Sequence, residues 1–119
     1  MSALSWFEIP ATDIERARRF YEAIFAFEMK ALDLGDLQMA LFPTGGGALC
    51  QHRTFYEPSA DAGALVYLNA APDLAIVLGR VEAAGGKVVV PKRQISPEYG
   101  YMAVFRDSEG NRVALHSMA

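Results

Sequence analysis

The most constraining feature of this sequence is an internal repeat. A strand, a helix and three further strands are predicted in the first half, and the same order is predicted in the second half. Asp13 and Asp73, sixty positions apart, each follow a predicted strand and begin a predicted helix. A single module of this kind leaves one sheet face uncovered, so two curved sheets must face each other, either within the chain or across a dimer. The repeat therefore predicts an α+β fold of two βαβββ modules that form an incurved sheet around a central cavity.

Two helices carry this repeat. The first is predicted over residues 12–25, where Thr12 and Glu15 have the spacing of a capping box and the apolar residues recur at helical period. The second is predicted over residues 72–84, and Pro72 suits its first turn.

The remaining periodic segments predict strands separated by turns. They lie at 4–9, 27–33, 38–42 and 48–53 in the first module, and at 65–70, 87–95, 99–106 and 112–117 in the second, with a tight turn at 107–110.

Residues 91–100 contain two prolines and a glycine, and we expect them to form a loop between strands. Lys92, Arg93 and Tyr99 could reach a ligand at the cavity mouth from this loop. Alternatively, Lys92 and Arg93 protect a sheet edge after the apolar run at 88–90, and we favour this second interpretation.

The composition predicts one domain, residues 1–119, with modules at about 1–56 and 63–119. Hydrophobic residues make up 52% and charged residues 21% of the chain, which excludes a disordered or fibrous protein. A single cysteine, Cys50, cannot form an internal disulfide. Stability must therefore come from packing.

Charge and hydropathy also restrict the partners. The net charge is −3 and the basic residues are scattered among acidic ones, so we expect no nucleic-acid partner. Pro43 and a run of glycines interrupt the longest uncharged stretch, so we expect no membrane span. The first charged residue is Glu8, so the basic segment of a signal peptide is missing. We expect a cytoplasmic protein.

Five segments resemble the vicinal oxygen chelate superfamily, which includes glyoxalases, bleomycin resistance proteins and extradiol dioxygenases. In chain order they are WFEIP (6–10), DIERA (13–17), FYE (20–22), VEAAGGK (81–87) and DSEGNR (107–112). They span nearly the whole chain. The resemblance implies the two-module fold and a homodimer, but it does not by itself assign a chemistry.

The metal enzymes of this superfamily take one metal ligand from the first and one from the last strand of each module. The resemblance carries these positions onto Trp6, Cys50 or Gln51, Leu65 or Val66, and Ala114. A catalytic metal needs about three protein ligands, and at most one donor is retained here. We therefore expect no metal at the usual position, although a displaced divalent site is an open alternative.

Strand alternation predicts which side chains line the cavity. Phe7 and Ile9 suit the helix side of their strand, which leaves Trp6 and Glu8 facing inward. The same alternation places three further residues inward, namely Tyr67, Asn69 and His116.

Aromatic area combined with a few polar groups is typical of a small-molecule pocket. We assign ligand binding to Trp6, Tyr67, Asn69, Gln51 and Tyr99. The alternative is a sheet face that touches only solvent or a dimer partner, with Trp6 as a packing anchor. We expect Trp6 to lie partly buried against Tyr67.

Glu8 and His116 are the best candidates for a catalytic acid and base, because a histidine near a carboxylate can titrate near neutrality. The alternative is a terminal-strand histidine bonded to the backbone or to water. Cys50 is better described as a small apolar strand residue than as a nucleophile.

Three functions remain open at this point. The first is a metal-free module that binds a small aromatic or cationic molecule. The second is a lyase or isomerase that uses Glu8 and His116 or a displaced metal. The third is a structural or regulatory dimer with a vestigial pocket. The missing metal ligands favour the first or the third.

Overall fold

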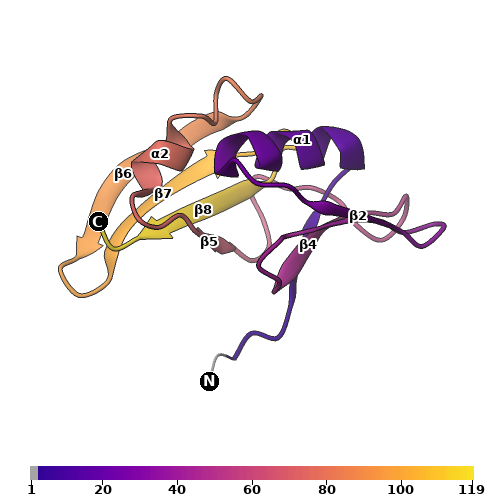
Figure 1. Ribbon diagram of the computed structural model, residues 1–119, viewed down its shortest axis with the longest axis horizontal. Coiled ribbons are helices and arrows are strands. Elements are labelled where there is room, and N and C mark those ends of the chain that lie inside the picture. The colour runs from indigo at the N-terminus through magenta and orange to yellow at the C-terminus, as the bar shows by residue number, and fades with distance from the viewer. Residues whose placement is uncertain (1–2) are drawn as a thin grey trace.

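The computed structural model describes residues 3–119, which form two modules with the same order of elements (Figure 1). The first contains β1 (Phe7–Pro10), α1 (Ile14–Phe25), β2 (Lys30–Asp33), β3 (Gln38–Leu41) and β4 (Gly47–Gln51). The second contains β5 (Tyr67–Asn69), α2 (Leu74–Leu78), β6 (Lys87–Ser96), β7 (Gly100–Arg106) and β8 (Arg112–Ser117). The predicted α+β class and the two βαβββ modules are confirmed.

Each module has its own four-stranded sheet, and the two sheets repeat one topology. The strand orders are β1-β4-β3-β2 and β5-β8-β7-β6. The first strand of each module runs parallel to the last, β1 beside β4 and β5 beside β8, and the other pairs are antiparallel. The helix between the first and second strands of each module makes this parallel pairing possible.

One apolar core joins the two modules. Both helices lie on the same side of the sheets in Figure 1, and the side chains beneath them form a single cluster drawn from both modules. The rings of Phe20 and Tyr21 on α1 lie 5.8 and 6.2 Å from the ring of Phe105 on β7. The helix of the first module therefore packs on the sheet of the second, which is how both modules cover their helix-side faces.

The cap of α1 differs from the sequence prediction. Asp13, not Thr12, is the N-cap, and its carboxylate accepts a hydrogen bond from the Arg16 N–H at 3.1 Å. Glu15 forms an ion pair with Arg18, so the predicted capping box is wrong. Thr12 is engaged elsewhere, because its N–H and hydroxyl donate to Glu109.

The second helix is shorter than predicted. It begins after Asp73, whose side chain caps the Ala75 N–H, and ends at Leu78 with Gly79 as the C-cap. Glycine is unfavourable in a helix interior, so Gly79 favours the end of the helix at this point. Turns follow from Gly79 to Gly85. In residues 3–119, no helix has the length and apolar character needed to cross a membrane.

The loop predicted over residues 91–100 is largely a strand. β6 continues to Ser96 through Pro91, and its pairing with β7 shifts register between Val90 and Arg93. A proline is tolerated here because β6 is an edge strand and the irregularity removes the need for its missing N–H.

The turn between β7 and β8 connects the second module to the start of α1. The Glu109 carboxylate has no exposed surface and accepts hydrogen bonds from the Thr12 and Asp13 N–H groups and from Arg16. Burial raises the pKa of Glu109, but the hydrogen bonds from Arg16 and the two N–H groups outweigh burial and lower it to about 2.

Glu109→Gln should therefore destabilise the fold in a pH-dependent way. At neutral pH we expect a loss of about 1 to 2 kcal/mol in the free energy of unfolding, because charge-assisted hydrogen bonds to a half-exposed arginine are lost. The folded pKa lies below the unfolded one, so this difference should shrink as pH falls from about 4.5 to about 2. Urea titrations across this range measure it.

The matched control is Glu98→Gln, which removes an exposed carboxylate from the β6–β7 turn. Its stability should equal that of the unaltered protein. A Glu109→Gln penalty that stays constant down to the lowest pH would contradict the account.

Candidate functional site

The predicted alternation of β1 is confirmed. Phe7 and Ile9 pack into the shared core, and Trp6 and Glu8 lie on the opposite face, where the Trp6 indole N–H donates to the Glu8 carboxylate at 3.2 Å. Gly47 helps to fix this arrangement, because the Phe7 ring occupies the space that a Cβ at that position would need.

Glu8 is held by a second donor that the sequence did not reveal. The Tyr56 hydroxyl, from the segment after β4, donates a short hydrogen bond to the Glu8 carboxylate. This bond to a negative charge raises the pKa of Tyr56 well above its usual value. Only the folded chain brings these two residues together, because they lie 48 positions apart.

Cys50 lies fully buried beside this pair, on the same face of the sheet. Burial, followed by the nearby charge of Glu8, raises the pKa of the Cys50 thiol to about 12. The thiol is therefore protonated at neutral pH, as expected of an unreactive strand cysteine rather than a nucleophile.

Three predicted site residues meet on the second sheet. Tyr67, Asn69 and His116 line one open groove of about 760 Å³. Asn69 and His116 are direct partners across the parallel β5–β8 pair, and Tyr67 pairs with Ala114 two positions earlier.

The His116 ring has a defined orientation. Its Nε2 lies 2.6 Å from the backbone carbonyl oxygen of Tyr99, and a carbonyl can only accept. Nε2 must therefore carry a proton, so the tautomer with a lone pair has it on Nδ1. Asn69 likewise uses its oxygen for the Ala71 N–H, which leaves the amide nitrogen as a donor for a ligand.

Two other predicted ligand-binding residues have structural contacts. Gln51 lies on the helix side of β4, where its side-chain oxygen accepts from the Ile14 N–H at 2.7 Å and supports the start of α1. Tyr99 is 62% exposed in the β6–β7 turn and holds His116 through its backbone, not its ring.

The structure separates residues that we expected to act together. No ring contact joins Trp6 to Tyr67 among residues 3–119, because Trp6 precedes β1 in one sheet and Tyr67 lies on β5 in the other. The expected packing of Trp6 against Tyr67 is therefore wrong within the chain. Glu8 and His116 likewise line different pockets.

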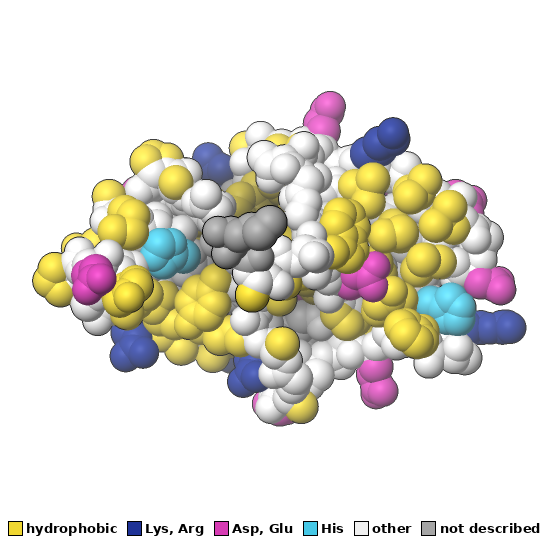
Figure 2. Space-filling model, turned by 90° about the horizontal axis from the view of Figure 1, so that it is seen from below, with side chains coloured by type: hydrophobic (Ala, Val, Ile, Leu, Met, Phe, Trp, Pro, Cys, Tyr) yellow, Lys and Arg dark blue, Asp and Glu magenta, His cyan; other side chains and the backbone are white. Residues whose placement is uncertain are grey.

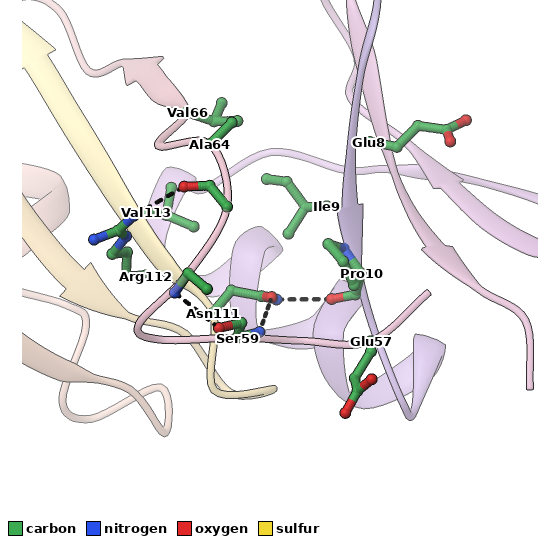
Figure 3. A pocket seen from close by; sticks show the side chains of 12 residues that line it. Glu8, Ile9, Pro10, Glu57, Ser59, Ala64, Val66, Asn111, Arg112 and Val113 are labelled. Carbon is green, nitrogen blue, oxygen red and sulfur yellow. Dashed lines mark hydrogen bonds between the residues drawn. The ribbon is translucent and has the colours of Figure 1, made fainter. Parts of the chain in front are cut away.

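The pocket that includes Glu8 in its lining lies between β1, β8 and the segment joining the modules (Figure 3). Figure 3 shows the Glu8 side chain pointing away from this pocket, while Ile9 points toward β8. The pocket has a volume of about 260 Å³. Its polar side chain Arg112 already donates a hydrogen bond to the Gly63 carbonyl oxygen at 2.9 Å. We therefore do not assign ligand binding to this pocket.

The two sheet faces that the helices leave uncovered carry separate apolar clusters. One contains Met39, Ala48 and Cys50, and the other contains Met102, Val104 and Ala114. Seen from below, apolar side chains gather in two areas, one toward each end of the molecule (Figure 2). Within residues 3–119, the two clusters are separate.

The residues that the resemblance aligns with the metal positions of the superfamily's enzymes have other contacts in this structure. Ala114 and Leu65 pack together in an apolar cluster, Trp6 donates to Glu8, and Cys50 keeps its proton. Within residues 3–119, no three His, Cys, Asp or Glu side chains gather closely enough to hold a metal. Gln51, the other candidate at the second position, uses its side-chain oxygen for the Ile14 N–H.

The sequence matches the model of the Glyoxalase/Bleomycin resistance protein/Dioxygenase superfamily over residues 3–115. The chain belongs to this superfamily. A Glyoxylase-like domain-containing protein from Didymella fabae is 31% identical over 117 residues, covering 94% of this chain and 91% of that protein.

Solved structures of superfamily members share the fold. A glyoxalase/bleomycin resistance protein from Albidiferax ferrireducens has a TM-score of 0.72 at 17% identity, covering 99% of this chain and all of the other. The fosfomycin resistance protein FosX from Mesorhizobium loti has a TM-score of 0.66 at 19% identity, covering 100% of this chain and 94% of the other. At these identities the likeness shows the fold alone.

The environment of Cys50 predicts slow alkylation. At mildly alkaline pH, iodoacetamide should label Cys50 at least about a hundredfold more slowly in the folded protein than in denaturant, because few thiols are ionised. Mass spectrometry over time measures the rate. A Cys50→Ala variant that carries Ser5→Cys, at an exposed position, is the control and should react rapidly when folded. Rapid labelling of native Cys50 would show that the thiol is not held as described.

Proposed function

We propose that this superfamily member is a small-molecule-binding protein that works without the usual catalytic metal and holds its ligand in the groove of Tyr67, Asn69 and His116. The observation that carries the proposal is the meeting of these three side chains in one groove of about 760 Å³. The groove is large enough for a ligand of ordinary metabolite or drug size.

The chemistry of the groove supports a ligand with a flat apolar part and hydrogen-bonding groups. The Tyr67 ring is 50% exposed and offers apolar area, while Asn69 offers an amide donor and His116 offers Nδ1. Two structural relatives are described as resistance proteins, one of the bleomycin type and one of the fosfomycin type. Those names support a role directed at small molecules.

The uncovered sheet faces support a homodimer. The shared core uses the helix sides of both sheets, whereas the opposite faces carry the half-exposed rings of Trp6 and Tyr67, which a second copy could cover. A second copy related by a two-fold axis could place one sheet face over the other and enclose the groove.

A lyase or isomerase is the second candidate, and the orientation of His116 favours it. A neutral imidazole with its lone pair on Nδ1 is suited to remove a proton from a ligand. Because Glu8 lies on the first sheet and His116 on the second, we expect them to act on the same ligand only if a second copy brings the two faces together. A displaced metal site would be a further requirement for metal-dependent chemistry.

A ligand screen by thermal shift tests the binding proposal. A compound that binds the native protein should raise the melting temperature equally with and without chelator. His116→Gln and Asn69→Ala should each weaken that compound about tenfold, because each removes a hydrogen bond to it. His52→Gln changes the other histidine and should bind normally.

Binding that survives both groove substitutions would contradict the proposed site. A thermal shift that disappears with chelator, or product formation that requires added metal, would contradict the metal-free proposal.

The homodimer proposal predicts a mass of twice the 13.0 kDa chain. Light scattering at micromolar concentration measures this mass. Tyr67→Lys should yield monomers, because it puts a charge at a half-exposed position of a sheet face expected to be covered. Ile76→Lys, at an exposed position of α2, should leave the dimer intact. A 13.0 kDa species for the unaltered protein would contradict the proposal.

A further inference from the structure

The Glu8 carboxylate lies in an apolar, aromatic surface. We call this surface the Glu8 patch, and it comprises Trp6, Glu8, Leu32, Leu37, Met39, Leu41, Phe55 and Tyr56. The right-hand apolar area of Figure 2 lies over the first sheet and contains acidic side chains among apolar ones. A carboxylate at this position packs less favourably against apolar neighbours than an apolar side chain would, so a purely structural role does not account for it.

The carboxylate is positioned from two sides. Trp6 donates from the segment before β1, and Tyr56 donates from the segment after β4. Both donors are neutral, so they orient the carboxylate without cancelling its charge. A carboxylate offers about four acceptor positions, so it can accept further hydrogen bonds from a ligand.

Among residues 3–119, no cation forms an ion pair with Glu8. In the ion pairs formed by residues 3–119, Glu8 has no part, although Asp13, Glu15, Glu22, Asp73 and Glu109 are all paired. The negative charge of Glu8 therefore remains available to a positively charged group from outside the chain.

Both donors to this carboxylate are aromatic, and a third ring packs against one of them. Phe55 is 77% exposed and packs edge-on against Tyr56 at 5.1 Å, and Trp6 is 44% exposed. Exposed rings beside a carboxylate suit an organic cation, because the ring faces attract positive charge and also cover an apolar body.

We propose that the Glu8 patch binds an organic ammonium group attached to an aromatic or aliphatic body. The ammonium donates to Glu8, and the body lies against Trp6, Phe55 and Tyr56. This inference rests on the proposed function. It adds that the part of the ligand bound at the first sheet carries a positive charge.

Three matched probes test the charge preference. Phenethylamine is cationic, 2-phenylethanol is neutral and 3-phenylpropionate is anionic, while the ring is common to all three. Trp6 is the only tryptophan, so its fluorescence reports this patch. We expect phenethylamine to bind at least about tenfold more tightly than 2-phenylethanol, and 3-phenylpropionate to bind most weakly.

Two variants separate charge from packing. Glu8→Gln should bring phenethylamine to the affinity of 2-phenylethanol, whereas Tyr56→Phe keeps the carboxylate and should retain the cation preference. Glu57→Gln is the matched control, because it removes a nearby exposed carboxylate outside the patch and should leave all three titrations unchanged. Melting temperatures confirm that each variant is folded.

Equal binding of the three probes, or a cation preference that survives Glu8→Gln, would overturn the inference. Trp6 emission that changes with protein concentration but not with phenethylamine would also overturn it, because a second copy would then fill the patch. If the unaltered protein shows no cation preference while a groove ligand still binds through His116, only this inference is refuted. If the cation preference depends on Glu8 but no ligand binds through His116, only the proposed groove is refuted.

Discussion

The buried carboxylate of Asp107 is the contact on which the arrangement of the two modules depends. It lies in the β7–β8 turn and accepts from the Tyr21 hydroxyl of α1 at 2.7 Å and from the Asn111 side chain at 3.0 Å. Two backbone N–H groups of the turn also donate to it. Asn111 in turn donates to the Pro10 carbonyl oxygen at the end of β1. Burial raises the pKa of Asp107, and these donors offset part of that cost. One turn of the second module thus holds both the helix and the first strand of the first module.

This junction determines which surfaces are left for function. Because α1 packs across both sheets, the helix-side faces are buried in one core, and the opposite faces are not covered by a helix. The two open faces differ in chemistry. The first carries the Glu8 carboxylate among aromatic rings, and the second carries Asn69 and the oriented ring of His116. A ligand that met both faces would need a cationic part for one and hydrogen-bonding groups for the other.

The sequence predicted the elements better than their contacts. Module order, strand faces and the place of Asp73 at the start of the second helix follow from period and local chemistry, which are encoded within a few residues. The role of Thr12 was missed because its partner, Glu109, lies 97 positions away. Tyr56 was missed for the same reason, since only the folded chain brings it to Glu8. Alternation correctly placed Tyr67, Asn69 and His116 on one face, but it could not show that Trp6 and Glu8 belong to a separate face.

Native-state hydrogen exchange tests most directly whether the two modules share one core. The backbone amides of Leu49 in β4 and Leu115 in β8 are both fully buried, one in each module. If the modules are joined as described, the two amides should exchange with the same opening free energy and the same denaturant dependence, because they are exposed only by global unfolding. Exchange of one module at a clearly lower free energy, with the other still protected, would contradict the shared core and with it the assignment of the open faces.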